Sequence, residues 1–135
     1  MPHSEDDFGF SEEKAGQNLA VLAESLFLIN LLLLPGLAFA GLFALWLKNK
    51  DSAPPLARQH LRQTTFVSLV GGFLIVTLSG LILALGGLDW AWTWVVLVLY
   101  FTCIHSTLVL FGMYGLIKAM ARQVWRFPLI GPPLE

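Results

Sequence analysis

Two histidines are the residues of this sequence whose side chains are best suited to bind a metal or a haem iron. His60 lies in a basic stretch between two apolar runs, and His105 lies near the middle of the last apolar run. A haem held by both would need them at a similar depth, but their expected depths differ by about a dozen helical residues, or about 18 Å. We therefore predict no cofactor held by this chain alone, and leave open a haem or quinone that His105 shares with a partner.

The residues around His105 also fit a structural role. Thr102, His105 and Gly112 share one helical face, where a neutral histidine can hydrogen-bond across a helix interface and small residues allow close approach. A matching stripe of small residues occurs in the preceding apolar run. The residues that we expect to pack on other helices or on a partner are Ser68, Gly72, Ser79, Thr102, His105 and Gly112. A proton relay or a quinone contact at His105 is the alternative.

No constellation in the sequence points to catalysis. Glu24 is expected at a membrane interface, and Asn30 lies deeper and needs a partner. A carboxylate without a paired base or metal ligands does not make an active site. The sequence has no nucleophile with a base at a suitable spacing, no phosphate-binding glycine loop and no metal-ligand spacing, and its single Cys103 excludes an internal disulfide. We predict that the chain is not an enzyme and holds no metal.

The elements that position these residues are expected to be membrane-spanning helices. Of the 135 residues, 56% are hydrophobic and only 13% are charged, and the mean hydropathy is +0.72. A soluble domain of this size cannot usually bury so much apolar surface. We predict an all-α integral membrane protein with three transmembrane helices, at about 26–47, 66–88 and 92–118. Pro35-Gly36 falls inside the first span and predicts a kink there.

The segments that flank the spans carry the charge. We divide the chain into an acidic tail at 1–18, a transmembrane domain at 19–118 with a basic loop at 48–65, and a proline-rich tail at 119–135. Basic residues near span ends collect on the cytoplasmic side, so we predict the N-terminus outside, the C-terminus in the cytoplasm and the cell inner membrane as the location. The loop residues expected to contact lipid or cytoplasm are Lys48, Lys50, Arg58 and Arg62. Because these charges border membrane spans, we predict no nucleic-acid partner.

The run LLLPGLAFAGLFALWLKNKDSAPPLARQHLRQTTF, at 32–66, resembles a family of small bacterial membrane proteins of unknown function. That family is distantly similar to the chloroplast inner-envelope import component. A Pro-Gly-containing span that ends in Trp-Leu, a Lys/Asp-Ser-Pro loop and a terminal aromatic-Pro-Leu motif, here Phe127-Pro128-Leu129, carry the resemblance. The resemblance implies a compact helical bundle that serves a larger assembly.

Three functions are compatible with this sequence. The first is a small non-catalytic accessory or structural subunit of a larger membrane complex, which packs through the small and polar helix faces and contacts membrane lipids. The second is an electron-transfer subunit, associated with haem or quinone, of a respiratory or photosynthetic complex. The third is a transport or translocation component, in which Glu24, Asn30 and His105 would line a small aqueous path.

Overall fold

The computed structural model of the chain describes residues 5–129, 131 and 132, with side chains from Glu13 onward. These residues form four helices, which are α1 (Glu5–Leu32), α2 (Leu37–Asn49), α3 (Pro55–Gly86) and α4 (Ala91–Met120). Three of them, α1 from Glu13, α3 and α4, are long and apolar enough to cross a membrane, whereas α2 is shorter. The prediction of an all-helical chain with three such helices is confirmed. The acidic tail, however, is helical from Glu5 onward and belongs to α1.

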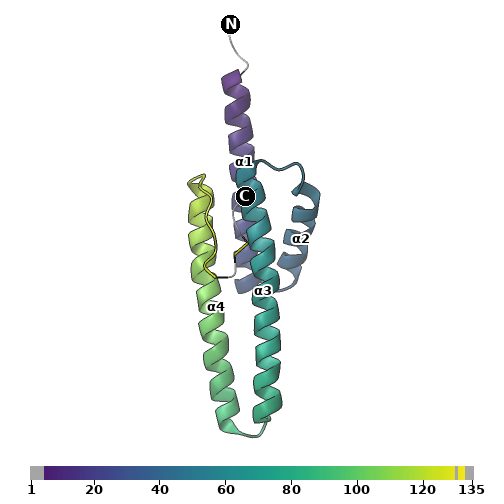
Figure 1. Ribbon diagram of the computed structural model, residues 1–135, viewed down its shortest axis with the longest axis vertical. Coiled ribbons are helices and arrows are strands. Elements are labelled where there is room, and N and C mark those ends of the chain that lie inside the picture. The colour runs from purple at the N-terminus through teal and green to yellow at the C-terminus, as the bar shows by residue number, and fades with distance from the viewer. Residues whose placement is uncertain (1–4, 130, 133–135) are drawn as a thin grey trace.

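The expected first span at 26–47 is not one kinked helix but two helices that run in opposite directions (Figure 1). Pro35 has no backbone N–H and ends α1, and Gly36 reverses the chain with a φ of +89°, which favours glycine. The backbone N–H groups of Leu33 and Leu34 both donate to the carbonyl of Ile29 at 2.9 Å. These bonds satisfy two backbone N–H groups at the start of the turn. The chain can therefore reverse direction at a place where only a kink was expected.

The helices pair as two hairpins of unequal height. Figure 1 shows α3 and α4 as a long hairpin joined by a short turn, while the shorter α1–α2 hairpin lies against only the part of it that is distant from that turn. The N-terminal part of α1, the α2–α3 loop and the end of α4 therefore lie at one end of the molecule. Consistent with this, Arg122 donates to Gln17 at 2.9 Å and to Glu13 at 3.5 Å.

This arrangement corrects the predicted topology of the tails. We expect the N-terminal tail on the side opposite to the basic loop and the C-terminal segment, but Glu13 and Gln17 lie beside Arg122. The physical reason is the reversal at Pro35, which adds one change of direction to the chain. Which end of the molecule faces the cytoplasm stays a prediction.

The core consists of two apolar clusters along the shared part of the hairpins. Residues Ala23, Leu42, Ala53, Ala57 and Leu61 join α1, α2 and the start of α3. Residues Phe27, Val67, Leu108 and Phe127 join α1, α3, α4 and the C-terminal tail. The tail has no regular structure at 123–127, and Figure 1 shows it running back along α4. The second cluster therefore depends on a tail that folds back onto the helices.

Candidate functional site

The best-defined polar site is a buried pair formed by Glu24 of α1 and His60 of α3. The Glu24 Oε1 and His60 Nδ1 atoms are 2.6 Å apart, and the side chains are 3% and 0% exposed, respectively. We expect Glu24 at one interface and His60 at the other. The structure brings them together because α1 ends at Leu32 and the chain returns through α2 before α3 begins.

The hydrogen bond of the second ring nitrogen of His60 determines which atoms of the pair carry protons. His60 Nε2 lies 2.9 Å from the carbonyl oxygen of Gln123, and because a carbonyl can only accept, Nε2 must carry a proton. One further proton then lies between His60 Nδ1 and Glu24. If Glu24 holds it, the two groups are neutral; if His60 holds it, they are an imidazolium and a carboxylate. In both cases the pair has no net charge, which suits its buried place.

His60 also belongs to a set of three α3 side chains that hold the C-terminal tail. We call Gln59, His60 and Gln63 the tail clamp. Gln59 donates to the carbonyl of Trp125, His60 donates to that of Gln123, and the Gln63 side-chain oxygen accepts from the Phe127 N–H at 2.7 Å. These bonds reach every second tail residue, as an extended backbone allows. The clamp therefore binds the tail by its backbone.

Aromatic side chains complete the docking of the tail. The rings of Phe111 and Phe127 meet edge to face, with centroids 5.1 Å apart, and those of Tyr114 and Trp125 do so at 5.0 Å. Phe127 is only 5% exposed. Such pairs favour this geometry and add to the apolar burial. The tail is thus fixed by backbone hydrogen bonds on its α3 side and by rings on its α4 side.

Two glycines of α4 allow α1 to approach closely enough to form this site. A Cβ at Gly112 would lie 2.8 Å from atoms of Phe27 and Leu28, and a Cβ at Gly115 would lie 2.6 Å from a carboxylate oxygen of Glu24. Both distances are shorter than side chains tolerate, so a larger residue would push α1 away. The glycines therefore set the position of Glu24.

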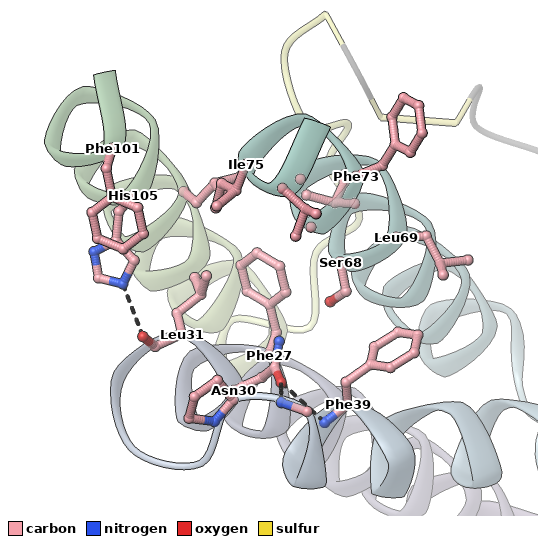
Figure 2. A pocket seen from close by; sticks show the side chains of 17 residues that line it. Phe27, Asn30, Leu31, Phe39, Ser68, Leu69, Phe73, Ile75, Phe101 and His105 are labelled. Atoms are coloured by element: carbon pink, nitrogen blue, oxygen red, sulfur yellow. Dashed lines mark hydrogen bonds between the residues drawn. The ribbon is translucent and has the colours of Figure 1, made fainter. Parts of the chain in front are cut away.

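A second site lies where the α1–α2 turn meets α3 and α4. Figure 2 shows a cavity there with Phe27 and Phe39 among its walls. Its volume is about 630 Å³, within the range of about 300–1,000 Å³ that is usual for small-molecule sites. Ser68 also lines it.

His105 and Asn30 shape the turn beside this cavity. The carbonyl of Leu31 would normally accept from the N–H of residue 35, but Pro35 has none. His105 Nε2 donates to this carbonyl at 2.8 Å instead, and the Asn30 side-chain oxygen accepts from the N–H groups of Gly36 at 2.8 Å and Phe39 at 3.2 Å. Side chains thus replace the hydrogen bonds that the broken helix loses.

The chain was compared with known proteins. Residues 15–134 match the sequence profile of the magnetosome magnetite crystal formation protein family. The chain belongs to this family. No curated protein and no solved structure gives a significant match.

Membership of the magnetosome magnetite crystal formation family changes part of our interpretation. The match fits the expectation of a small membrane-protein family, but nothing in the comparisons supports a similarity to the chloroplast import component. Together with the three long apolar helices, it indicates a protein of a membrane. The family's description connects it with magnetite crystals, which the sequence alone does not suggest.

The residues singled out in the sequence of this family member lie in different surroundings. Gly112 is buried against α1, His105 bonds α1, and Ser68 lines the cavity. Gly72 and Thr102 are exposed, and Ser79 is half-buried. In this part of α3 it is the neighbouring Gly71 that touches α4, since its Cβ would lie 3.1 Å from Leu108.

The charged residues of the loop lie near the end of the molecule that holds both tails. Lys48 and Lys50 are exposed, while Arg58 and Arg62 are partly buried. Arg58 donates to the carbonyl of Ala53 at 3.2 Å. Among the residues with described side chains, no three His, Cys, Asp or Glu side chains gather as metal ligands would. The absence of a metal or cofactor of this chain's own stays a prediction.

Sequence reasoning missed the Glu24–His60 pair and the tail clamp. The signal that could have revealed them is the combination of Pro35-Gly36 with Asn30 six residues before Gly36. An asparagine can cap the helix that follows a break. A cap at this position favours two helices over one kinked helix, and two helices return the chain so that Glu24 meets α3.

Proposed function

We propose that this chain is a small non-catalytic membrane component of a magnetite-forming compartment, which works by assembling with other membrane proteins. The family's role in magnetosome magnetite crystal formation supports the compartment. The structural support is that three polar side chains at the centre of the chain hold its own elements together. Glu24, His60 and Gln63 bind one another or the tail, which leaves assembly to the outer faces of the helices.

The observation that supports assembly with other proteins is that one half of the α3–α4 hairpin is not covered by the other helices. Beyond the α1–α2 turn, no third helix of the described chain accompanies it (Figure 1). Thr102 of α4 is exposed where this part begins, about one helical turn before His105, which bonds Leu31 of α1, and a Cβ at Gly80 of α3 would meet nothing within 4 Å. Hydroxyls and small residues on a lipid-facing surface favour helix–helix contact. We infer that another protein covers this face.

Extraction of the tagged protein in mild detergent tests the proposal. We expect other membrane proteins to co-purify in a fixed ratio, and Thr102→Leu to abolish their retention by filling the contact surface. Val96→Leu is the matched control, since Val96 is also exposed on α4 but lies on a different face. In a magnetite-forming cell that lacks its own family member, the chain should restore crystal size in electron micrographs, and Thr102→Leu should not. A protein that purifies alone and leaves crystal size unchanged would contradict the proposal.

We further propose that the end with both tails faces the cytoplasm of an inner membrane or of a compartment derived from it. The exposed Lys48 and Lys50 lie at this end, and basic residues favour the cytoplasmic side. Single cysteines at Lys14 and Asp89, in a chain with Cys103→Ser, test it with an impermeant thiol reagent. We expect Lys14→Cys to react only from the cytoplasm and Asp89→Cys only from the opposite side. The reverse pattern would invert the orientation.

A further inference from the structure

The cavity between the α1–α2 turn and the α3–α4 hairpin contains a hydroxyl without a partner. Ser68 Oγ is buried, and no group of the described residues hydrogen-bonds it. Figure 2 shows this hydroxyl pointing toward the space between Phe27 and Phe39. A buried polar atom without a partner is costly, and among the side chains that line this cavity Ser68 Oγ is such an atom. The hydroxyl therefore points to a ligand with a group that it can hydrogen-bond.

A second donor faces the same cavity. Asn30 lines it, and its side-chain oxygen is already used by the N–H groups of Gly36 and Phe39. Its amide nitrogen is thus the part of the side chain that can still donate. Two donors, one from Ser68 and one from Asn30, suit a ligand that presents carbonyl acceptors.

The depth of the cavity restricts the kind of ligand. His105 lines it and lies about 21 Å from the start and about 22 Å from the end of α4. Because the hydrocarbon core is about 30 Å thick, this position falls within the core wherever α4 is placed along the membrane normal. The ester carbonyls of a glycerolipid lie near the edge of the core, whereas a prenyl quinone carries its carbonyls on an apolar ring that can enter it.

The walls fit the same ligand. Phe27 and Phe39 line the cavity on either side of the Ser68 hydroxyl (Figure 2), and aromatic faces stack on flat conjugated rings. The volume of about 630 Å³ accommodates a quinone ring and the first part of its tail. An acyl chain would fill the same volume but would leave the Ser68 hydroxyl unpaired.

We propose that this cavity binds the ring of a prenyl quinone, with the Ser68 hydroxyl and the Asn30 amide donating to ring carbonyls. The site is independent of the proposed assembly role, because the cavity lies within one chain. The proposal concerns binding and assigns no redox step to the protein.

Photolabelling in nanodiscs tests the assignment. The purified full chain is reconstituted in nanodiscs of glycerolipid with a trace of an azido-quinone, irradiated, and mapped by mass spectrometry. We expect saturable labelling of α3 near Phe73 that excess decylubiquinone abolishes. The glycerolipid is present in large excess throughout, so a site that prefers acyl chains would give no saturable labelling, which would overturn the proposal.

Two leucine variants form a matched pair. Gly72 lines the cavity and Gly41 does not, while a Cβ at either position would meet nothing within 4 Å. Gly72→Leu should fill the cavity and lower quinone affinity at least about tenfold, which is a modest steric effect, and Gly41→Leu should leave it unchanged. Equal affinity for both variants would overturn the assignment.

Ser68→Ala keeps the proposal testable if Gly72→Leu fails to fold. Removing the hydroxyl deletes one hydrogen bond to the ligand and relieves an unpaired buried group of the free protein. We expect quinone affinity to fall about fivefold, with no loss of thermal stability in the quinone-free protein. An unchanged affinity would refute the role of Ser68.

Discussion

The Glu24–His60 pair allows a quantitative test of what holds α1 against α3. The perturbation is a double-mutant cycle with Glu24→Ala, His60→Ala and both together. Because the side chains are 3% and 0% exposed, water cannot replace the missing partner. Removal of one member of a buried pair costs about 3–5 kcal/mol. We expect each single variant to lose this much free energy of unfolding.

The double variant should lose much less than the sum of the single variants. With both groups gone, neither member of the pair is left without the other, and the remaining loss comes from packing and from the bond of His60 to the Gln123 carbonyl. We expect a coupling energy of about 2–4 kcal/mol, well above the roughly 0.5 kcal/mol found for independent sites. The assay is unfolding by SDS in mixed micelles, followed by far-UV circular dichroism. Additive losses would refute the inference that the pair acts as a unit.

Glu24→Gln tests the shared proton separately. A glutamine amide can donate to His60 Nδ1 while His60 keeps its proton on Nε2, as the bond to Gln123 requires. The variant should therefore cost only about 1 kcal/mol, the scale of one hydrogen bond exchanged for a weaker one. A loss as large as that of Glu24→Ala would show that a neutral donor cannot satisfy the histidine.

Three further substitutions test the turn, the helix contact and the tail. Gly112→Ala should lower the free energy of unfolding by about 1–3 kcal/mol by overpacking against α1, whereas Gly80→Ala, in open space, should be neutral or stabilising by up to about 1 kcal/mol. Gln63→Ala should release the tail from α3 and speed tryptic cleavage after Arg126. Asn30→Leu removes the acceptor of two turn N–H groups and should cost about 1–2 kcal/mol, measured by the same SDS titration.

A specific result would contradict each of these three predictions. Equal stability of the two glycine variants would mean that α1 does not approach α4 as closely as the structure shows. Unchanged cleavage of Gln63→Ala would mean that the aromatic contacts alone hold the tail. Full stability of Asn30→Leu would show that the turn does not depend on this side chain.

The apolar runs of the sequence were enough to predict the helices that a lipid environment requires. Long apolar runs must satisfy their backbone groups internally, and a helix does so within one segment. The membrane-length helices α3 and α4 therefore follow from the apolar runs of the sequence, whereas the first long apolar helix, α1, ends at Leu32 and does not occupy the predicted span at 26–47. The prolines at 128, 132 and 133 predict a tail that does not continue α4.

The reversal at Pro35 could not be predicted from the same kind of information. A proline removes one donor whether the helix bends or ends, so the outcome depends on which groups satisfy the exposed backbone. Here the acceptor is Asn30, six residues before Gly36, and the donor is His105, 74 residues after Leu31. The second of these contacts exists only once the tertiary structure has formed.

The small residues of α3 show a second limit of what the sequence can predict. Gly71 and Gly72 are neighbours, and successive helical residues point about 100° apart. The sequence favours Gly72 by its spacing, but the structure packs Gly71 against Leu108 and leaves Gly72 facing the cavity. When two adjacent residues are equally small, the rotation of the helix is decided by the partner helix.

The unequal heights of the two hairpins give the molecule a tapered outline. The four helices of the described residues share the end that holds both tails, and of these only α3 and α4 reach the other end (Figure 1). At a helix diameter of about 10 Å, the wide end occupies roughly 160 Å² more of the membrane plane than the narrow end. Such a wedge fits best where one leaflet is more expanded than the other. Many copies in one patch would therefore favour a curved bilayer, with the wide ends on its convex side.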